Sequence, residues 1–217
     1  MPFWGKLEKA AITGRGIDIG CGPDPVTASA RRFDMEHGDA NEITRYVNDQ
    51  FDFVYSSHCL EHMHDPRFTI LDWWKLVRPG GYLFVTVPDE DLYEQGIFPS
   101  KFNTDHKATF TISKARSWSP VSHNVLELAQ SLPDGQLLCL ILQDAGYDRT
   151  LMAFGNRTAT IAVRFLAKAY GILARVVGEA RLLSIRRILV QYFPVDQTSQ
   201  GCNAQAQIQL IVKKMES

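Results

Sequence analysis

A buried strand that runs straight into a glycine-containing loop restricts the fold of this chain more than any other feature. Residues 16–20 read GIDIG, and residues 21–25 continue as CGPDP. Glycine allows both a tight turn and the close approach of a ligand to the backbone. The stretch nearly matches the dinucleotide pattern G-x-G-x-x-G, but Pro25 stands in the place of the third glycine. Proline suits the start of a helix, but here it weakens the prediction of a pyrophosphate site.

Further segments predict an α/β fold with a mostly parallel sheet. Residues 51–57 (FDFVYSS) read as a strand, and Asp65-Pro66 supplies an N-cap and a first-turn proline for a helix. This helix is expected to stop at residues 78–81 (RPGG), before a strand over residues 82–88. Strand, helix and strand with short connections are typical of a doubly wound sheet. Two later strands are predicted over residues 136–142 and 204–212, with one or two helices over 158–193 between them.

Length, charge and cysteine usage restrict the class of protein. The 217 residues suit one domain spanning residues 1–217, and a net charge of −1 argues against a nucleic-acid partner. No apolar run approaches the roughly 20 residues that cross a membrane, and the N-terminal MPFWGKLEKA lacks the apolar core of a secretory signal. The four cysteines form no C-x-x-C pair, so we expect no disulfide framework or zinc knuckle, and we predict a cytoplasmic location.

Two aspartates after the glycine loop favour an adenosine-containing ligand. Ligands of parallel sheets bind at the carboxyl ends of the strands. Asp34 lies 16 residues after Asp18, near the position where an acidic residue accepts hydrogen bonds from ribose hydroxyls. Asp39, in Gly-Asp-Ala, is a candidate acceptor for the adenine amino group. S-adenosylmethionine fits this pattern because it has no pyrophosphate, and its ammonium group favours an acid such as Asp18.

Five sequence blocks in a fixed order resemble a known family. IDIGCG, FD, GDA, FDFVYSSHCLEHMHDP and LVRPGGYLFVTVP cover roughly residues 15–90. Their order and spacing resemble the class I S-adenosylmethionine-dependent methyltransferases, whose pattern reads D-x-G-C-G, GDA, FD-x-V, LEH and L-x-PGG. The resemblance implies a Rossmann-like sheet whose last strand runs antiparallel, and it implies S-adenosylmethionine as the cofactor.

The resemblance also implies three groups of cofactor-binding residues. The glycine loop holds the methionine end, through Asp18, Gly20, Cys21 and Gly22. The adenosine is held by Asp34 at the ribose and by Asp39 and Ala40 at the adenine. The sulfonium lies near the two residues that follow the strand at 51–57, namely Ser57 and His58.

The chain departs from the family pattern in two places. Only four residues separate Asp34 from Asp39, where the family usually has a helix and a strand, so we expect a trimmed sheet edge. The predicted first strand also comes without the N-terminal helices that often cover the substrate in the family. We therefore expect the cover to come from residues 89–130, from residues 158–193 or from a second subunit.

Histidines and acids gather at residues 58–65 and raise the question of a metal. A helical His-x-x-x-His pair would indicate one, but the helix is expected to start only at Asp65, so we expect a loop or short turn and no bound metal. A hydroxyl nucleophile needs a group that takes its proton, and histidine suits this role. His58 and His106 are the candidate catalytic bases, with His62 third. Alternatively, His58 only lines the cofactor site and His106 is a solvated loop residue.

Residues 89–130 are predicted to form a loop-rich insertion that covers the substrate. The insertion follows the strand at 82–88, where the family places its substrate contacts. Its aromatic side chains either stack on a sugar ring or anchor the loop to the core: Tyr93, Phe98, Phe102 and Trp118. Residues 88–124 resemble a subgroup of small bacterial methyltransferases of surface-polysaccharide synthesis, which favours a glycan hydroxyl as the methyl acceptor.

Residues 157–193 are predicted to form a basic amphipathic helical insertion. They carry seven basic residues and one acid, a net charge of +6. At about 100° per residue, basic side chains share one side and apolar ones the other: Arg164, Lys168, Arg175 and Arg186 against Leu166, Leu173 and Val177. Such a helix can lie on an anionic membrane, which here is the inner membrane surface. It can equally be a solvated face of a helix that packs against the sheet or against a second copy in a homodimer.

Three functions are therefore carried forward. The leading one is an S-adenosylmethionine-dependent methyltransferase that methylates the oxygen of a sugar or glycan hydroxyl, or of another small molecule, by in-line transfer. An NAD(P)-linked Rossmann oxidoreductase is disfavoured by Pro25 and by the lack of an evident hydride-transfer set. A catalytically silent scaffold of the methyltransferase fold would bind cofactor weakly or not at all. Nucleic acid is not expected as substrate, because residues 55–58 read YSSH instead of the N/D-P-P-Y type.

Overall fold

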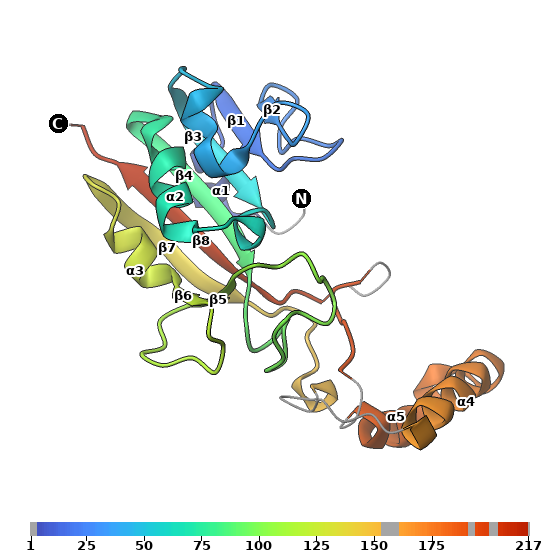
Figure 1. Cartoon of the computed structure of the whole chain (residues 1–217). Coiled ribbons are helices and arrows are strands. Elements are labelled where there is room, and N and C mark those ends of the chain that lie inside the picture. The colour runs from blue at the N-terminus through green and yellow to red at the C-terminus, as the bar shows by residue number, and fades with distance from the viewer. Residues whose placement is uncertain (1–3, 153–160, 191–193, 200–203, 217) are drawn as a thin grey trace.

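A six-stranded mixed sheet forms the centre of the fold (Figure 1). The computed structural model describes residues 4–152, 161–190, 194–199 and 204–216. The strands of the sheet are β1 (Gly16–Ile19), β2 (Arg31–Phe33), β3 (Phe51–Ser57), β4 (Val77–Pro88), β7 (Gly135–Gln143) and β8 (Gln207–Lys214). Their order across the sheet is β2-β1-β3-β4-β8-β7.

Strand directions confirm the predicted Rossmann-like sheet with an antiparallel last strand. β1 pairs in parallel with both β2 and β3, and β3 pairs in parallel with β4. β8 runs antiparallel to both of its neighbours, β4 and β7. The chain order reverses between β1 and β3, which is the switch point where ligands of such sheets bind.

The connection between β1 and β2 consists only of turns, so the prediction of a helix start at Pro25 is wrong. Gly20 and Gly22 have positive φ angles of 75° and 56°, which turn the chain back at once. The carboxylate of Asp18 accepts the N–H of Val26 at 2.6 Å and fixes the returning segment. Because β2 is the edge strand and only the 3₁₀ helix η1 (Ala40–Arg45) lies between it and β3, the edge is short, as expected.

The helix after β3 begins as its sequence predicts. In α2 (Pro66–Lys75), the Asp65 carboxylate accepts the N–H groups of Arg67 and Phe68, and Pro66 occupies the first turn. The helix ends at Lys75, earlier than predicted, because the chain enters β4 at Val77. The predicted stop signal, residues 78–81, therefore lies inside β4.

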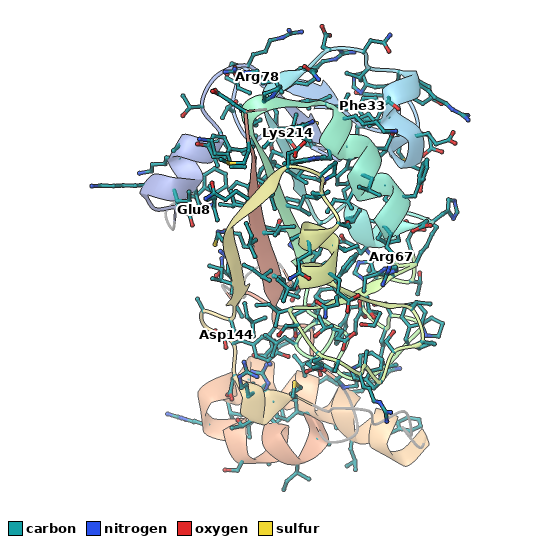
Figure 2. All side chains as sticks on the ribbon, turned by 90° about the vertical axis from the view of Figure 1, so that its left-hand side faces the viewer. Glu8, Phe33, Arg67, Arg78, Asp144 and Lys214 are labelled. Carbon is teal, nitrogen blue, oxygen red and sulfur yellow. The ribbon has the colours of Figure 1, made fainter. Side chains whose placement is uncertain are left out.

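Two hydrophobic layers cover the faces of the sheet. On one face, Trp73 of α2 and Leu128 of α3 (Val125–Gln130) pack in the larger core cluster. On the other, Ala11 of α1 (Lys6–Ala11) packs with Phe84 of β4. Figure 2 shows α1, marked by Glu8, on the opposite side of the sheet from α2. Because hydrophobic layers cover both faces of the sheet, the carboxyl ends of the parallel strands remain available for a ligand-binding site.

The segment 89–130 is loop-rich, as predicted, but it also contains regular elements. β5 (Thr109–Thr111) and β6 (Ser122–Asn124) form a two-stranded parallel sheet, and α3 follows. A buried carboxylate, Glu90, accepts hydrogen bonds from Ser117 and Ser122 at 2.8 and 2.5 Å. The insertion is therefore tied down by its own buried polar network.

The predicted helical insertion forms two helices, α4 (Ile161–Val177) and α5 (Leu183–Val190), joined by η4 (Glu179–Leu182). Residues 157–160 and 191–193 of the prediction lie outside the described residues. The chain turns at Gly178, whose φ is 89°, so a single helical projection does not extend to Arg186 and that part of the prediction is wrong. In Figure 2, Arg78 and Asp144 mark opposite ends of the sheet, and α4 and α5 lie beyond the Asp144 end.

Two further sequence expectations concern membranes and cysteines. Within the described ranges, no helix combines the length and the apolar character that crossing a membrane requires. Cys21, Cys59 and Cys139 are free thiols, while Cys202 lies outside the described residues.

Candidate active site

A cavity of about 720 Å³ opens beside the glycine loop, at the carboxyl ends of β1, β2 and β3. The volume lies in the range of about 300–1,000 Å³ that is usual for ligand sites. Six of the predicted cofactor residues line it: Gly20, Gly22, Asp34, Asp39, Ala40 and His58. The other three, Asp18, Cys21 and Ser57, lie outside its lining.

The glycine loop is shaped for close approach by a ligand. A Cβ on Gly22 would meet nothing within 4 Å, so this backbone faces open space. A Cβ on Gly20 would come within 2.7 Å of the Cys59 side chain, which explains the glycine there. Asp34 holds the loop from the side, because its carboxylate accepts the N–H of Gly22 at 2.7 Å and of Met35 at 2.8 Å. Each carboxylate oxygen keeps a further lone pair for a ligand hydroxyl.

Asp18 acts behind the loop and does not line the cavity. Its side chain is 3% exposed, and it accepts the N–H of Val26. Burial raises the pKa of Asp18 to about 6; the Val26 hydrogen bond opposes this shift and the charge of Asp34 adds to it. The structure thus gives Asp18 a positioning role for the loop, together with a negative charge beneath it when ionised.

Asp39 and Ala40 lie at the start of η1. The Asp39 carboxylate caps η1 by accepting the backbone N–H of Asn41 at 2.9 Å and its side-chain amide at 2.7 Å. These hydrogen bonds, the side-chain one first, lower the pKa of Asp39. The carbonyl of Ala40 accepts the indole N–H of Trp73 at 2.8 Å. Both residues therefore have fixed positions at the cavity wall.

Ser57 does not line the cavity beside the glycine loop. Its hydroxyl accepts a hydrogen bond from Thr86 at 2.8 Å, and it lines a separate cavity of about 210 Å³ with Trp4 and Tyr55. The turn after β3 carries the next residue, His58, back to the main cavity at a φ of 53°. A positive φ is uncommon for a residue other than glycine.

A second cavity of about 380 Å³ adjoins the first. His58 and His62 line both cavities. Apart from two alanines, each described lining residue carries a hydrogen-bonding group: His58, Glu61, His62, Tyr93, Asn103, His106, Thr198, Gln205 and Gln207. The two cavities therefore share a boundary at His58 and His62.

His58 is held at this boundary from two sides. Its Nε2 lies 2.8 Å from the amide oxygen of Gln207, and its Nδ1 lies 3.4 Å from Oε1 of Glu61. Burial lowers the pKa of His58, but the Glu61 carboxylate and the Gln207 hydrogen bond outweigh it, so the net shift of the pKa is upward. The side chain is 44% exposed, which keeps it open to a ligand.

His106 lies deep in the second cavity. Its side chain is 3% exposed, so the interpretation of His106 as a solvated loop residue is wrong. Its Nδ1 lies 2.7 Å from Oε1 of Glu94, and its ring stacks on Tyr93 at 5.3 Å. Tyr93 in turn packs edge-on against Phe102. Of the four predicted stacking aromatics, Tyr93 is the one that lines this cavity.

The insertion is fastened to the turn after β3 by backbone hydrogen bonds. The carbonyl of Glu61 accepts the N–H groups of Lys107 and Ala108 at 2.8 and 3.1 Å. His62 Nδ1 lies 2.9 Å from a carboxylate oxygen of Asp105. His106 is thereby brought beside η2 (Leu60–His62), although the two segments are far apart in the sequence.

Several site residues were not identified from the sequence. Those that line the first cavity are Phe33, Met35, Gly38, Asn41, Tyr46, Met63 and Lys107. Phe33 and Met35 flank the predicted Asp34, so proximity in the sequence was an available signal. Glu94, the partner of His106, carried no such signal, because no periodic pattern links residues 94 and 106.

A glycine loop, an acid at the end of the second strand and a cavity at the switch point define a class I methyltransferase architecture. The family profile described as a methyltransferase domain matches residues 4–151, which is more than half of the chain. The chain therefore belongs to this family of methyltransferase domains.

Individual relatives are distant. A ubiquinone biosynthesis O-methyltransferase from Aromatoleum aromaticum is 38% identical over 56 residues, a stretch that covers 26% of this chain and only 24% of that protein. A solved structure from Bacillus halodurans C-125 covers 97% of this chain and 97% of its own, with a TM-score of 0.51 and 10% identity. A S-adenosylmethionine-dependent methyltransferase from Archaeoglobus fulgidus covers 96% of this chain and 89% of its own, with a TM-score of 0.47 and 14% identity.

Proposed function

We propose that this enzyme transfers the methyl group of S-adenosylmethionine to a hydroxyl oxygen of a sugar or glycan. The observation that carries the proposal is the pair of adjoining cavities that share His58 and His62. Methyl transfer is an in-line displacement, so donor and acceptor must meet end to end. Two cavities with one common boundary supply that arrangement.

The larger cavity is proposed to hold the cofactor. We assign the ribose hydroxyls to Asp34 and the adenine to Asp39 and Ala40, which is supported by the position of all three residues in the lining of this cavity. The open backbone of Gly22 and the negative charge of Asp18 behind the loop favour the amino-acid end. The sulfonium would then point toward His58.

The smaller cavity is proposed to hold the acceptor. Its lining of histidine, carboxylate, amide and hydroxyl groups suits a molecule with many hydroxyls better than an apolar one. Tyr93 adds an aromatic ring to this lining, which suits contact with the apolar side of a sugar. The curated relative is named an O-methyltransferase, which supports oxygen as the acceptor atom. The assignment to surface-polysaccharide synthesis rests on the likeness of residues 88–124 described above.

We assign the proton acceptor to one of two histidines at the acceptor cavity, His58 or His106. His58 is the better placed, since it touches both cavities and remains partly exposed. The hydroxyl proton passes to the histidine, the oxygen forms a bond to the methyl carbon, and the carbon–sulfur bond breaks. S-adenosylhomocysteine leaves as a neutral thioether.

The test of this function combines binding and turnover. Isothermal titration of the full chain with S-adenosylhomocysteine and with NAD separates a methyltransferase from an oxidoreductase. Transfer of labelled methyl groups to a panel of sugars and glycans then identifies the acceptor. Binding of NAD without S-adenosylhomocysteine, or methylation of nitrogen acceptors alone, would contradict the proposal.

The location of the enzyme is proposed to be the cytoplasm, at the inner membrane surface. Helix α4 exposes a row of apolar side chains, with exposed fractions from 38% to 78%: Phe165, Leu166, Ile172, Leu173, Val176 and Val177. Neither α4 nor α5 contains an acidic residue, and Lys168 and Arg175 are exposed. An apolar face together with basic side chains favours an anionic lipid surface. A homodimer through the same helices is the alternative that a vesicle assay distinguishes.

A further inference from the structure

We propose that Glu61, His62 and His106 form a binding site for one divalent transition-metal ion in the acceptor cavity. One ligand atom from each of these residues lies within 4.8 Å of the other two, and all three residues line the cavity of about 380 Å³. An ion held at about 2.0–2.2 Å from each atom separates tetrahedral ligands by roughly 3.5 Å. Side-chain adjustments of about 1 Å therefore suffice to close the site.

Both histidines are oriented as metal ligands usually are. Nδ1 of His106 lies 2.7 Å from Glu94, and Nδ1 of His62 lies 2.9 Å from Asp105. Each ring thus uses one nitrogen on a carboxylate and leaves Nε2 for an ion. Ligating histidines typically make this kind of hydrogen bond with the nitrogen that does not bind the metal. The two rings face each other edge-on, with centroids 5.0 Å apart.

The third ligand is a buried carboxylate with an oxygen to spare. Glu61 is 1% exposed, and its Oε1 lies 3.9 Å from Nε2 of His106. Within the described parts of the chain, Oε2 of Glu61 is buried without a hydrogen-bond partner. A buried carboxylate oxygen without a hydrogen-bond partner is unfavourable, so a cation offers the interaction that Oε2 lacks.

The ligand set selects the kind of ion. Two imidazoles and one carboxylate suit borderline ions such as Zn²⁺, Fe²⁺ and Co²⁺, whereas Ca²⁺ and Mg²⁺ prefer oxygen ligands. Three protein ligands leave at least one position open, as in catalytic zinc sites. The open position faces the cavity in which the acceptor is proposed to bind.

The role of the ion rests on the proposed function. An acceptor hydroxyl bound to the ion loses its proton more readily, because the cation stabilises the alkoxide. The proton passes to His58, the alkoxide oxygen bonds to the methyl carbon, and the bond from that carbon to sulfur breaks. His106 is then a ligand, which leaves His58 as the proton acceptor.

The test measures metal binding by the full chain after treatment with a chelator. Co²⁺ is titrated in while visible absorption reports its coordination, and Zn²⁺ is then used to displace it. Glu61→Gln and His62→Gln remove ligands, and Asp105→Asn removes an orienting carboxylate from an exposed position. His64→Gln is the matched control, since His64 is an exposed histidine of the same turn that lies outside the cluster. Far-ultraviolet circular dichroism and thermal unfolding check that each variant is folded, and binding of S-adenosylhomocysteine is measured separately.

We expect one Co²⁺ per chain, displaced by one Zn²⁺. Asp105→Asn is expected to weaken binding about 10-fold and the two ligand variants about 100-fold or more, with His64→Gln unchanged. Equal Co²⁺ affinity in the wild type, Glu61→Gln and His62→Gln would overturn the metal site. If S-adenosylhomocysteine binds and Co²⁺ does not, the metal site fails and the proposed function stands. If Co²⁺ binds and S-adenosylhomocysteine does not, the metal site stands and the proposed function fails.

Discussion

Replacing Asp34 by alanine is expected to weaken the binding of S-adenosylhomocysteine by about 10- to 150-fold. The carboxylate already accepts the N–H of Gly22 at 2.7 Å and of Met35 at 2.8 Å, so its position at the cavity wall is fixed before a ligand arrives. Hydrogen bonds to a charged group contribute about 1.5–3 kcal/mol, and about 1.4 kcal/mol corresponds to a factor of ten in affinity. Isothermal titration calorimetry on purified protein measures the change in Kd directly.

The control for this variant is Asp24→Ala. Asp24 lies exposed in the loop between β1 and β2 and outside the cavity lining, so its removal changes the net charge equally without touching the site. Asp34→Asn is expected to fall between the wild type and Asp34→Ala, because the amide oxygen still accepts one N–H but carries no full charge. An unchanged Kd in Asp34→Ala, or an equal loss in Asp24→Ala, would refute the assignment of the ribose to Asp34.

Asp18, His58 and the helices α4 and α5 each allow a further test. Because the pKa of Asp18 is raised to about 6 in the fold, its contribution to stability is present below about pH 4 and is lost as the pH rises through about 6. At pH values above about 6, Asp18→Asn should therefore raise the free energy of unfolding by up to about 3 kcal/mol. Urea titrations of the protein without cofactor measure this change. A lower free energy of unfolding in the variant than in the wild type at these pH values would contradict the burial argument. His58→Ala should lower turnover by about 10²–10⁴-fold and S-adenosylhomocysteine affinity by a smaller factor, because His58 also lines the cofactor cavity. His64→Ala should keep both, and near-full activity of His58→Ala would exclude His58 as the base. The protein should sediment with anionic vesicles at low salt and be released from them at high salt. If the protein sediments equally with neutral vesicles, or with neither kind of vesicle, packing of α4 and α5 in a dimer is favoured instead.

The architecture of the sheet was predictable because its signals are local. GIDIG predicts a buried strand before a turn, and Asp65-Pro66 predicts the helix that follows β3. The short spacing from Asp34 to Asp39 indicated the trimmed edge, because four residues cannot form both a helix and a strand. Each of these features depends on residues that are close together in the chain.

The errors arise where distant residues decide the local structure. The segment around Pro25 forms turns, which are held by partners outside it: the Asp18 carboxylate accepts the N–H of Val26, and the Arg32 guanidinium donates to the carbonyl of Gly22. The same hydrogen bond turns Asp18 away from the cavity. None of these partners is identified by helical or strand periodicity.

The site was predicted in part for a similar reason. The sequence pointed to the glycine loop and to Asp34 and Asp39, which line the larger cavity, because they lie after the first predicted strand and before the second. The pairing of His106 with Glu94 and its approach to Glu61 depend on how the insertion folds back over the turn after β3. Backbone hydrogen bonds from Lys107 and Ala108 to Glu61 fix that fold, and they leave no pattern in the sequence.

A structure of the enzyme bound to S-adenosylhomocysteine would show where the cofactor and its sulfur atom lie. We expect the adenosine in the cavity of about 720 Å³ against Asp34 and Asp39, with the sulfur at the boundary beside His58 and His62 and facing the smaller cavity. S-adenosylhomocysteine bound in the smaller cavity, or with its sulfur turned away from His58, would contradict the account of where the methyl group is transferred.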